Sequence, residues 1–280
     1  MRQEPRPHWS YSAINQYLRC PLQYYFQRIL KLPQPTVSSG LVLGSSIHNA
    51  LAVYHRYLME NQEPVEQQIR QEFFETWAFT SSKQTVEYRP KESVDDLMDQ
   101  GLLLLQLYMD APRPQGIVGV EKRFLVPIRN SRGEYLDTPL LAFMDLVSQE
   151  GDSLKVTELK TSGRAYGEFE VASSLQATCY VNATLETFDE MPVVEYAVLV
   201  KTKTPKLQRL KTARTEEDLG RLGDVVQNVE RAVANEIFYP VETPLNCSTC
   251  SYRQECQQWK PSNSTVVAQM ELHELNGAGA

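Results

Sequence analysis

The segment of residues 143–163, FMDLVSQEGDSLKVTELKTSG, constrains the fold of this chain more than any other stretch. Two apolar runs, residues 141–148 and 153–159, meet there across the polar stretch 149–152, which contains Gly151. Short apolar runs separated by a polar, glycine-containing stretch are typical of a β-hairpin. The sequence therefore predicts two adjacent antiparallel strands joined by a turn.

Three charged residues of this hairpin form a candidate site. Asp145 lies in the first strand, and Glu158 and Lys160 lie two residues apart in the second. Because strand side chains alternate between faces, Glu158 and Lys160 point to the same side. With Asp145 on that side as well, two carboxylates and an ammonium group converge, which suits a hard divalent cation and a phosphodiester. Taken alone, the pattern also fits exposed charges on one strand face. Glu121, in a strand expected at residues 117–128, is a weaker candidate, because an acid there also pairs with a neighbouring Lys or Arg.

The composition predicts a folded protein without a membrane span. The chain has 280 residues and 42% hydrophobic content, which is enough for a core. No run approaches the roughly 20 apolar residues that span a bilayer. The N-terminal segment MRQEPRPHWS lacks the apolar stretch of a secretory signal. A cytoplasmic location is therefore expected, where cysteines remain thiols or bind metals.

The net charge of -7 argues against a protein whose whole surface binds nucleic acid, since Lys and Arg neutralise phosphates. One local exception is the segment 201–211, KTKTPKLQRLK, which carries five positive charges and no acid. This strip is either a nucleic-acid-binding surface or a solvated, lysine-rich hairpin.

The rest of the chain shows helical and strand patterns in alternation. Apolar residues at helical spacing, capping residues and β-branched runs mark the elements. The expected helices cover residues 14–30 with a bend at Pro21, residues 40–57, residues 167–188 and residues 215–238. Two more helices are expected within residues 63–110, around a polar loop near residues 81–90. The further strands are expected at residues 117–128, 193–201 and 207–211. This order predicts an α/β fold with a mixed sheet. The helical part at about 61–112 is expected to be an insertion that shapes a channel.

Two helices carry pairs of residues one turn apart. Gly44 and His48 are spaced i to i+4, as are Gln176 and Tyr180, so each pair shares one helix face. His55 lies about 10 Å further along the axis than His48. It is too far away to share one metal ion with His48.

The C-terminal sequence NCSTCSYRQEC contains Cys247, Cys250 and Cys256 at the spacing C-x2-C-x5-C. Three cysteines so close together indicate metal ligands, but a tetrahedral thiolate set needs a fourth. Cys20 is favoured over Cys179, because Cys20 sits at a predicted helix bend and Cys179 on a buried helix face. A metal held in this way closes a very long loop between the two ends of the chain.

An ordered series of motifs resembles the PD-(D/E)XK nuclease superfamily. The likeness is greatest to its RecB-like branch with an iron-sulfur cluster, which includes the AddB nuclease domain and CRISPR-adaptation exonucleases. It extends over residues 10–259. The matching motifs, in family order, are Cys20-Pro21, Gly44-x3-His48, Asp145, Glu158-Leu159-Lys160, Gln176-x3-Tyr180 and the C-x2-C-x5-C series.

The resemblance implies a restriction-endonuclease-like architecture, in which helices flank a mixed central sheet. Residues 1–262 are expected to form a single nuclease domain with a helical N-terminal part. Cys20 and residues 244–259 would form the iron-sulfur part, in which the C-terminal cysteine cluster closes onto the N-terminus. Residues 263–280 are expected to be a flexible tail, with a short helix near residues 266–275.

The resemblance also implies roles for the hairpin residues. His48, Asp145 and Glu158 would ligate Mg2+ or Mn2+ together with the backbone carbonyl of Leu159. Lys160 would orient and help to deprotonate the attacking water and stabilise charge on the phosphate. The family commonly has Asp where Glu158 stands, and Glu is the other permitted residue.

Further positions match the family's binding residues. Gln176 and Tyr180 match the motif that holds the DNA strand beside the metal. The four cysteines at 20, 247, 250 and 256 match the ligands of a 4Fe-4S cluster, which in the family is generally a structural support for the DNA-binding surface. Structural Zn2+ held by four thiolates is the alternative. The five-residue gap and the distant first cysteine favour iron-sulfur.

The expected function is that of a metal-dependent DNA nuclease, an exonuclease on single-stranded DNA ends that hydrolyses phosphodiester bonds in repair or recombination. Two alternatives are a nuclease subunit of a CRISPR-adaptation complex and a non-catalytic DNA-binding scaffold of the same fold. The chain has no G-x-x-x-x-G-K-[ST] phosphate loop, so any unwinding requires a helicase partner. No membrane partner is expected.

Overall fold

The computed structural model describes residues 7–260 of the chain. These residues form two compact units, each with its own internal contacts. We call residues 7–12 and 34–228 the sheet unit, and residues 13–33 and 229–260 the cysteine unit.

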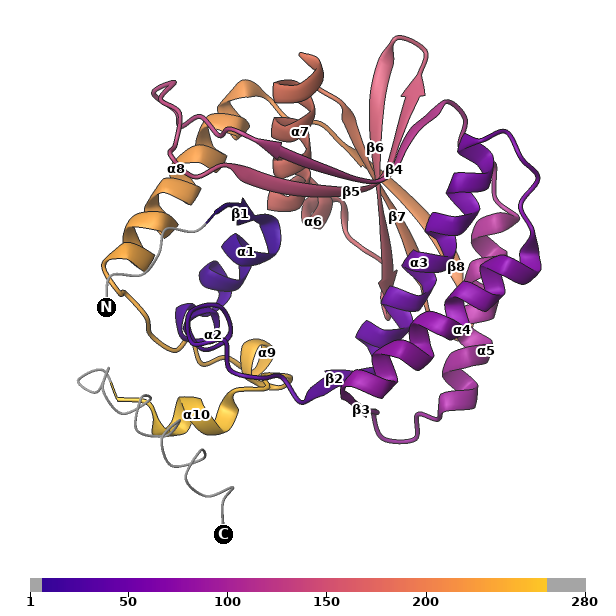
Figure 1. Ribbon diagram of the computed structural model, residues 1–280, viewed down its shortest axis with the longest axis horizontal. Coiled ribbons are helices and arrows are strands. Elements are labelled where there is room, and N and C mark those ends of the chain that lie inside the picture. Colours follow the sequence, from indigo (N-terminus) through magenta and orange to yellow (C-terminus); the bar gives the residue numbers. More distant parts are fainter. Residues whose placement is uncertain (1–6, 261–280) are drawn as a thin grey trace. The chain divides into compact units, whose positions relative to one another are not determined.

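A mixed sheet lies at the centre of the sheet unit (Figure 1). Its strands are β1 (Trp9–Ser10), β4 (Ile117–Val126), β5 (Leu140–Glu150), β6 (Ser153–Ser162), β7 (Val193–Val200) and β8 (Lys206–Thr212). The strand order is β1-β5-β6-β7-β8, and β4 also pairs with β5. The β1/β5 and β6/β7 pairs are parallel, and the other pairs are antiparallel. The expected α/β fold with a mixed sheet is therefore confirmed.

The central hairpin forms as the sequence predicts, but with a shorter turn. Strands β5 and β6 pair from Leu146 opposite Thr157 to Glu150 opposite Ser153. Only two residues remain for the turn, and Gly151 there has a positive φ of 62°, a conformation that glycine adopts without steric cost. Gln149 and Glu150, expected in the turn, instead extend the ladder, because a two-residue turn with glycine suffices to reverse the chain.

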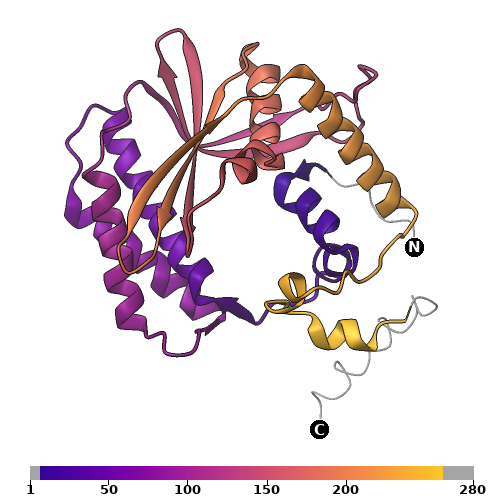
Figure 2. The same ribbon diagram turned by 180° about the vertical axis from the view of Figure 1, so that it is seen from behind.

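Helices cover both faces of the sheet. The helices of the sheet unit are α3 (Ser39–Met59), α4 (Glu66–Lys83), α5 (Val94–Met109), α6 (Glu168–Ala172) and α7 (Leu175–Phe188). α3 contacts β6 and α5 contacts β8, while α6 contacts β8 and α7 contacts β7. Figure 2 shows, from behind, α3 to α5 on one side of β6 to β8 and α6 and α7 on the other. The two helices expected within residues 63–110 are thus α4 and α5.

The helix expected over residues 167–188 is two helices, so that prediction was wrong in its continuity. α6 ends at Ala172 and α7 begins at Leu175. Ser174 between them has an extended backbone, with φ -67° and ψ 118°, and its side chain accepts a hydrogen bond from the Ala177 amide. A serine hydroxyl that caps a new helix competes with continuation of the old one.

The main core of the sheet unit lies between α3, α4, α5 and the strands β6 and β7. Gly101 of α5 packs directly against α4: a Cβ atom at that position would lie 2.4 Å from the Phe73 ring. Only a glycine lets the two helices pack at this point. A further small sheet pairs β2 (Thr36–Ser38) with β3 (Thr85–Glu87).

His55 of α3 is fully buried in this core. Its Nε2 atom lies 3.0 Å from the Tyr108 hydroxyl of α5. Burial, together with the positive charge of Arg209 and the neighbouring His48, lowers the pKa of His55 to about 3. His55 is therefore a neutral core residue that links two helices, in agreement with its exclusion from a metal site shared with His48.

This burial predicts a pH-dependent stability. Below about pH 6.5 the unfolded chain binds a proton at residue 55 that the folded chain does not bind until about pH 3. The free energy of unfolding therefore decreases as the pH is lowered from about 6.5 to about 3. Between pH 7.5 and 5.5 the loss from this residue is about 1.4 kcal/mol. Urea unfolding of the wild type and of His55→Gln at both pH values measures it. The variant keeps a polar partner for Tyr108, and equal losses in both proteins would contradict the prediction.

The cysteine unit is built from short helices. Its helices are α2 (Pro21–Tyr24), the π-helix η1 (Tyr25–Ile29), α9 (Pro244–Cys247) and α10 (Arg253–Gln258). It also includes residues 13–19 of α1 (Tyr11–Arg19) and residues 229–234 of α8 (Glu216–Ala234). Leu22, Phe26 and Tyr252 form its buried centre. As expected, the proline at position 21 starts a new helix directly after Cys20, whose backbone is extended.

Among residues 7–260, none of the helices combines the length and the apolar composition needed to cross a bilayer. The expected tail at residues 263–280, with its helix near 266–275, lies outside the described residues. The single domain expected over residues 1–262 stays a prediction, because compact units are defined by contacts and not by independent folding.

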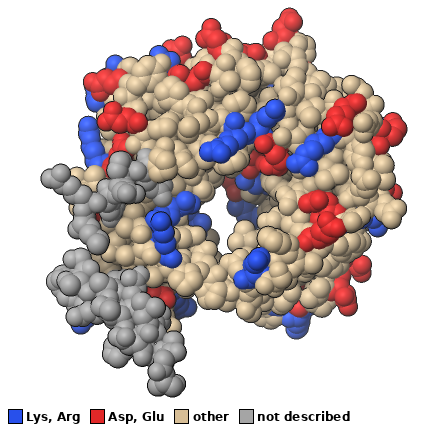
Figure 3. Space-filling model, in the orientation of Figure 1, with Lys and Arg blue, Asp and Glu red and all other residues tan. Residues whose placement is uncertain are grey.

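The basic strip at residues 201–211 has acidic neighbours in the folded chain. Arg209 of β8 binds Glu195 of β7 at 2.6 Å, and Lys211 lies 3.9 Å from Glu150. On the face shown in Figure 3, Lys and Arg are interspersed with Asp and Glu. Part of the positive charge of the strip is thus neutralised within the sheet unit.

Candidate active site and cysteine pocket

Asp145 lies where strands β5 and β6 stop pairing. The last ladder pair before it is Leu146 with Thr157, and the Asp145 Oδ2 atom accepts a hydrogen bond from the Leu159 amide at 2.7 Å. The carboxylate thus takes the position of a strand partner for β6. His48 of α3 reaches the same atom, with Nδ1 3.6 Å from Oδ2.

Glu158 is the centre of a second set of contacts. Its Oε1 atom accepts hydrogen bonds from Lys160 Nζ at 2.6 Å and from Gln176 Nε2 at 2.8 Å. The Tyr180 hydroxyl donates to Oε2. The predicted common orientation of Glu158 and Lys160 is therefore confirmed, and Gln176 also accepts from Lys160 Nζ at 3.0 Å.

The helix α7 supplies the amide and the phenol at i and i+4, as its sequence predicts. Gln176 Nε2 donates to the Tyr180 hydroxyl at 2.7 Å, so the two side chains share one face. Cys179 points elsewhere and is 1% exposed. The Ser174 cap sets where α7 begins and therefore which of its residues face Glu158.

The two carboxylates are held in an unfavourable electrostatic environment. Burial and the nearby Glu158 charge raise the pKa of Asp145 well above its ordinary value, in spite of the hydrogen bond from Leu159. Two acids brought together away from water favour the neutral form of one of them. A bound cation at this position would relieve the same repulsion.

The pKa values of the two basic side chains of the site, Lys160 and His48, are shifted in opposite directions. Burial acts to lower the pKa of Lys160, but the charge and the hydrogen bond of Glu158 outweigh it, and the pKa is raised. Burial lowers the pKa of His48 despite the opposing influence of Glu158. Lys160 is therefore an ammonium and His48 a neutral imidazole at neutral pH, and a neutral imidazole is the form that ligates metals.

Glu121 lies closer to the site than its ranking from the sequence suggests. Val120 pairs with Leu146 and Lys122 pairs with Met144, so Glu121 on β4 lies opposite Asp145 on β5. Its backbone φ is +51°, which is uncommon for a residue other than glycine. Burial raises the pKa of Glu121, Arg56 opposes the change, and Glu158 adds to it.

Sequence reasoning missed three phenols around Lys160. Burial raises the pKa values of Tyr11, Tyr166 and Tyr196, and the nearby positive charge of Lys160 opposes this increase. The Tyr196 hydroxyl lies 2.6 Å from Ser174 Oγ. These tyrosines come from distant parts of the chain, and no local spacing in the sequence marks them.

The donor types fit a hard divalent cation, but the side chains do not form a closed metal shell. Asp145, Glu158 and His48 offer two carboxylates and a neutral imidazole, as such ions accept. Within residues 7–260, no group of three or more His, Cys, Asp or Glu side chains is arranged to hold an ion. The reason at this site is that Glu158 is turned toward Lys160, Gln176 and Tyr180.

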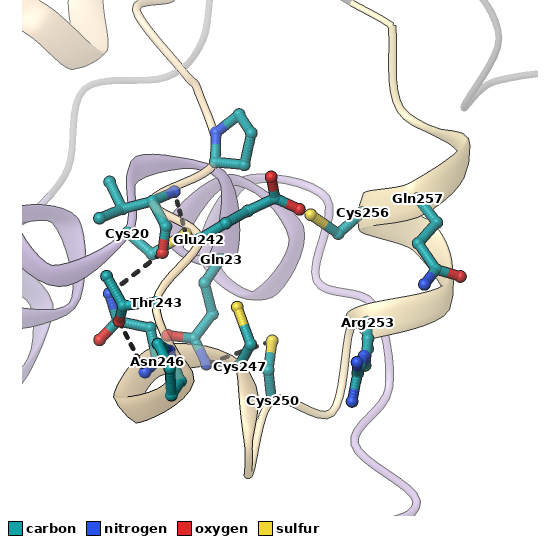
Figure 4. Close-up of a pocket in the computed structure, with 13 residues that line it drawn as sticks. Cys20, Gln23, Glu242, Thr243, Asn246, Cys247, Cys250, Arg253, Cys256 and Gln257 are labelled. Atoms are coloured by element: carbon teal, nitrogen blue, oxygen red, sulfur yellow. Dashed lines mark hydrogen bonds between the residues drawn. The ribbon is translucent and has the colours of Figure 1, made fainter.

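The four cysteines predicted as ligands line one pocket of the cysteine unit, of about 360 Å3. Figure 4 shows Cys247 on α9, Cys250 in the following loop and Cys256 on α10, with Cys20 beside them. All four are free thiols. The fifth cysteine, Cys179, belongs to the sheet unit and is not part of the pocket.

Two of the sulfur atoms of this pocket accept hydrogen bonds from nitrogen donors. The Val241 amide donates to Cys20 Sγ at 3.5 Å, and Gln23 Nε2 donates to Cys250 Sγ at 3.9 Å. Burial raises the pKa values of Cys250 and Cys256, and the other thiols of the pocket add to the effect. Hydrogen bonds to sulfur are one means by which proteins tune thiolate-bound metals.

The site thus combines two acids and a lysine from adjoining strands of a mixed sheet, a set of groups that suits a hard divalent cation and a phosphodiester. A model of the PD-(D/E)XK nuclease superfamily matches residues 8–257, nearly the whole chain. The chain belongs to this superfamily, as the motif series predicts. The search of curated proteins found no match.

Two solved structures match the chain at low sequence identity. A crystal structure from Eubacterium rectale, described as a "Putative exonuclease", matches with a TM-score of 0.55 and 13% identity, covering 91% of this chain and 88% of that chain. The crystal structure of SSO0001 matches with a TM-score of 0.35 and 14% identity, covering 87% of this chain and 95% of that chain. The first of these shares the fold of this chain.

Proposed function

We propose that this protein is a divalent-metal-dependent deoxyribonuclease, an exonuclease that acts on single-stranded DNA ends in repair or recombination. The observation that carries the proposal is the convergence of Asp145, Glu158 and Lys160 from the two strands of one hairpin, with His48 beside Asp145. Membership of the nuclease superfamily supports it. The exonuclease part draws on the description of the Eubacterium rectale protein.

His48, Asp145, Glu158 and the Leu159 carbonyl would hold Mg2+ or Mn2+. When bound, such an ion lowers the pKa of a water molecule and stabilises charge on the phosphate. Holding the ion requires the Glu158 carboxylate to turn away from part of its present contacts. Tyr180 and Gln176 then limit how far it turns, because both donate to it.

Lys160 would act through its charge. Because its pKa is raised, the side chain carries an ammonium at neutral pH and donates protons in hydrogen bonds without accepting one. Placed beside Glu158, it would orient the attacking water and stabilise the negative charge that grows on the phosphate oxygens as the new P–O bond forms and the old one breaks. The help with deprotonation that the family resemblance implies for Lys160 would then fall to another group of the site, because an ammonium has no lone pair to accept the proton.

We further propose that the cysteine pocket holds a 4Fe-4S cluster, and that the protein is of the RecB-like branch. Support comes from four free thiols around one pocket and from nitrogen donors aimed at two of the sulfurs. The cluster would staple the C-terminal cysteines to Cys20 and have a structural role. Structural Zn2+ on the same four thiols is the competing assignment.

The biological setting is a separate part of the proposal. A helicase partner would supply the single-stranded ends, because the chain has no phosphate-loop motif. A CRISPR-adaptation complex is the second setting that the family likeness suggests. A non-catalytic scaffold is the less favoured function, since all four residues are present, with His48 beside Asp145 and Lys160 hydrogen-bonded to Glu158.

Digestion of end-labelled and circular DNA tests the proposed activity. Linear single strands should be shortened from an end in Mg2+ or Mn2+, circular single strands should survive, and EDTA should stop the reaction. Cleavage of circles would replace the exonuclease by an endonuclease. Failure to cleave any linear or circular DNA with either metal would overturn the proposed function.

A further inference from the structure

Phe143 is exposed in a way that its position does not explain. It lies within β5, directly opposite Arg123 of β4. Its side chain is 52% exposed, whereas the adjacent Ala142 and Met144 are 4% and 0% exposed. Because strand side chains alternate, β5 has one packed face here and one open face that carries a large aromatic ring.

The open face of β4 and β5 carries an apolar and a basic side chain next to Phe143. Leu125, which follows Arg123 by two residues in β4, is 57% exposed and lies diagonally across from Phe143. The Arg123 side chain is also exposed, and within residues 7–260 it takes part in no ion pair or side-chain hydrogen bond. We call Arg123, Leu125 and Phe143 the platform: an apolar, aromatic surface edged by the Arg123 cation.

The platform is continuous with the candidate active site. Phe143 precedes Asp145 by two residues, so their side chains leave the same face of β5. Their Cα atoms are about 7 Å apart in an extended strand. A phosphodiester at the Asp145 carboxylate would therefore have its neighbouring nucleotide over the Phe143 ring.

We propose that the platform stacks an unpaired nucleobase next to the phosphodiester that is cut, which makes single-stranded nucleic acid the preferred substrate of this site. The inference rests on the proposed nuclease function. An aromatic ring and an arginine are the groups on which unpaired bases stack, and any base fits because each has a flat face. A base within a duplex is already stacked and paired, so it reaches such a ring only after unwinding. Arg123 would neutralise an adjoining phosphate.

The test compares substitutions of residue 143 in the full chain. Removal of a stacking aromatic is expected to lower kcat/KM on a single-stranded oligonucleotide by about tenfold in Phe143→Ala. Phe143→Tyr keeps the ring and should stay close to the wild type, whereas Phe143→Leu keeps only the apolar volume and should resemble Phe143→Ala. Phe79→Ala is the matched control, because Phe79 is 66% exposed on α4 and has no part in the platform.

Substrates with one missing base provide a readout that a folding defect would not reproduce. An abasic position is moved along the strand, and wild-type cleavage should fall when the missing base is the one beside the cut. Phe143→Ala should show no such position. Leucine that performs like phenylalanine, or an abasic penalty that is the same in wild type and Phe143→Ala, would overturn the platform while leaving the nuclease intact. A wild type that cleaves no DNA overturns the nuclease itself, and the platform with it.

Discussion

Lys160→Met is expected to lower the rate of DNA cleavage by about a hundredfold to a thousandfold, the usual loss when a preorganised charge is removed from a developing anion. The methionine keeps most of the apolar stem and removes the ammonium. Glu158 keeps the hydrogen bonds from Gln176 and Tyr180, so its position is retained. The loss should therefore appear in kcat, with DNA binding close to the wild type.

Single-turnover cleavage of a labelled single strand, alongside fluorescence anisotropy for binding, separates these quantities. Lys83→Met on α4 is a matched control, because Lys83 is exposed and lies outside the site. Full activity of Lys160→Met would reject its assigned role. A loss confined to binding would reassign Lys160 from catalysis to substrate attachment.

Replacement of Cys256 by alanine is expected to abolish the metal content of the cysteine pocket. Structural metals held by thiolates contribute on the order of 10 kcal/mol to folding. Loss of about half of this folding free energy would lower Tm by at least about 10 °C. The cysteine unit has only a small buried centre around Leu22, Phe26 and Tyr252, so little else compensates for the loss.

The measurement is metal analysis, visible absorption and thermal unfolding of protein purified without oxygen. The wild type should be brown and contain about four iron atoms per chain, and Cys256→Ala should be colourless and less stable. Cys179→Ala is the control, since Cys179 is a buried thiol of the sheet unit outside the pocket. A colourless wild type with one bound zinc ion would replace the cluster assignment by a zinc site. A wild type that contains no metal and has the same Tm as Cys256→Ala would reject both assignments.

The hairpin and its charged residues could be predicted from the sequence because both follow from local rules. Alternation along a strand places Glu158 and Lys160 together, and a glycine turn pairs their strand with that of Asp145. Helical spacing likewise joins Gln176 to Tyr180. The order of helices and strands was sufficient to predict a mixed α/β sheet.

Other features depend on which segments meet. The break before α7 follows from the capping choice of Ser174, which competes with a strong helical pattern on both sides. Tyr11, Tyr166 and Tyr196 approach Lys160 only because the chain folds back on itself. The positive φ of Glu121 and its position across from Asp145 have no local sequence signal at all.

Local periodicity by itself was enough to establish the hairpin, its charged face and the polar pair on α7, since each depends on residues only a few positions apart. Three-dimensional packing alone established that Glu158 is bound by Lys160, Gln176 and Tyr180, that Cys20 lines one pocket together with the three C-terminal cysteines, and that Phe143 is exposed beside Asp145. The physical reason is that burial, pKa and exposure depend on neighbours in space, and a sequence orders residues only along the chain.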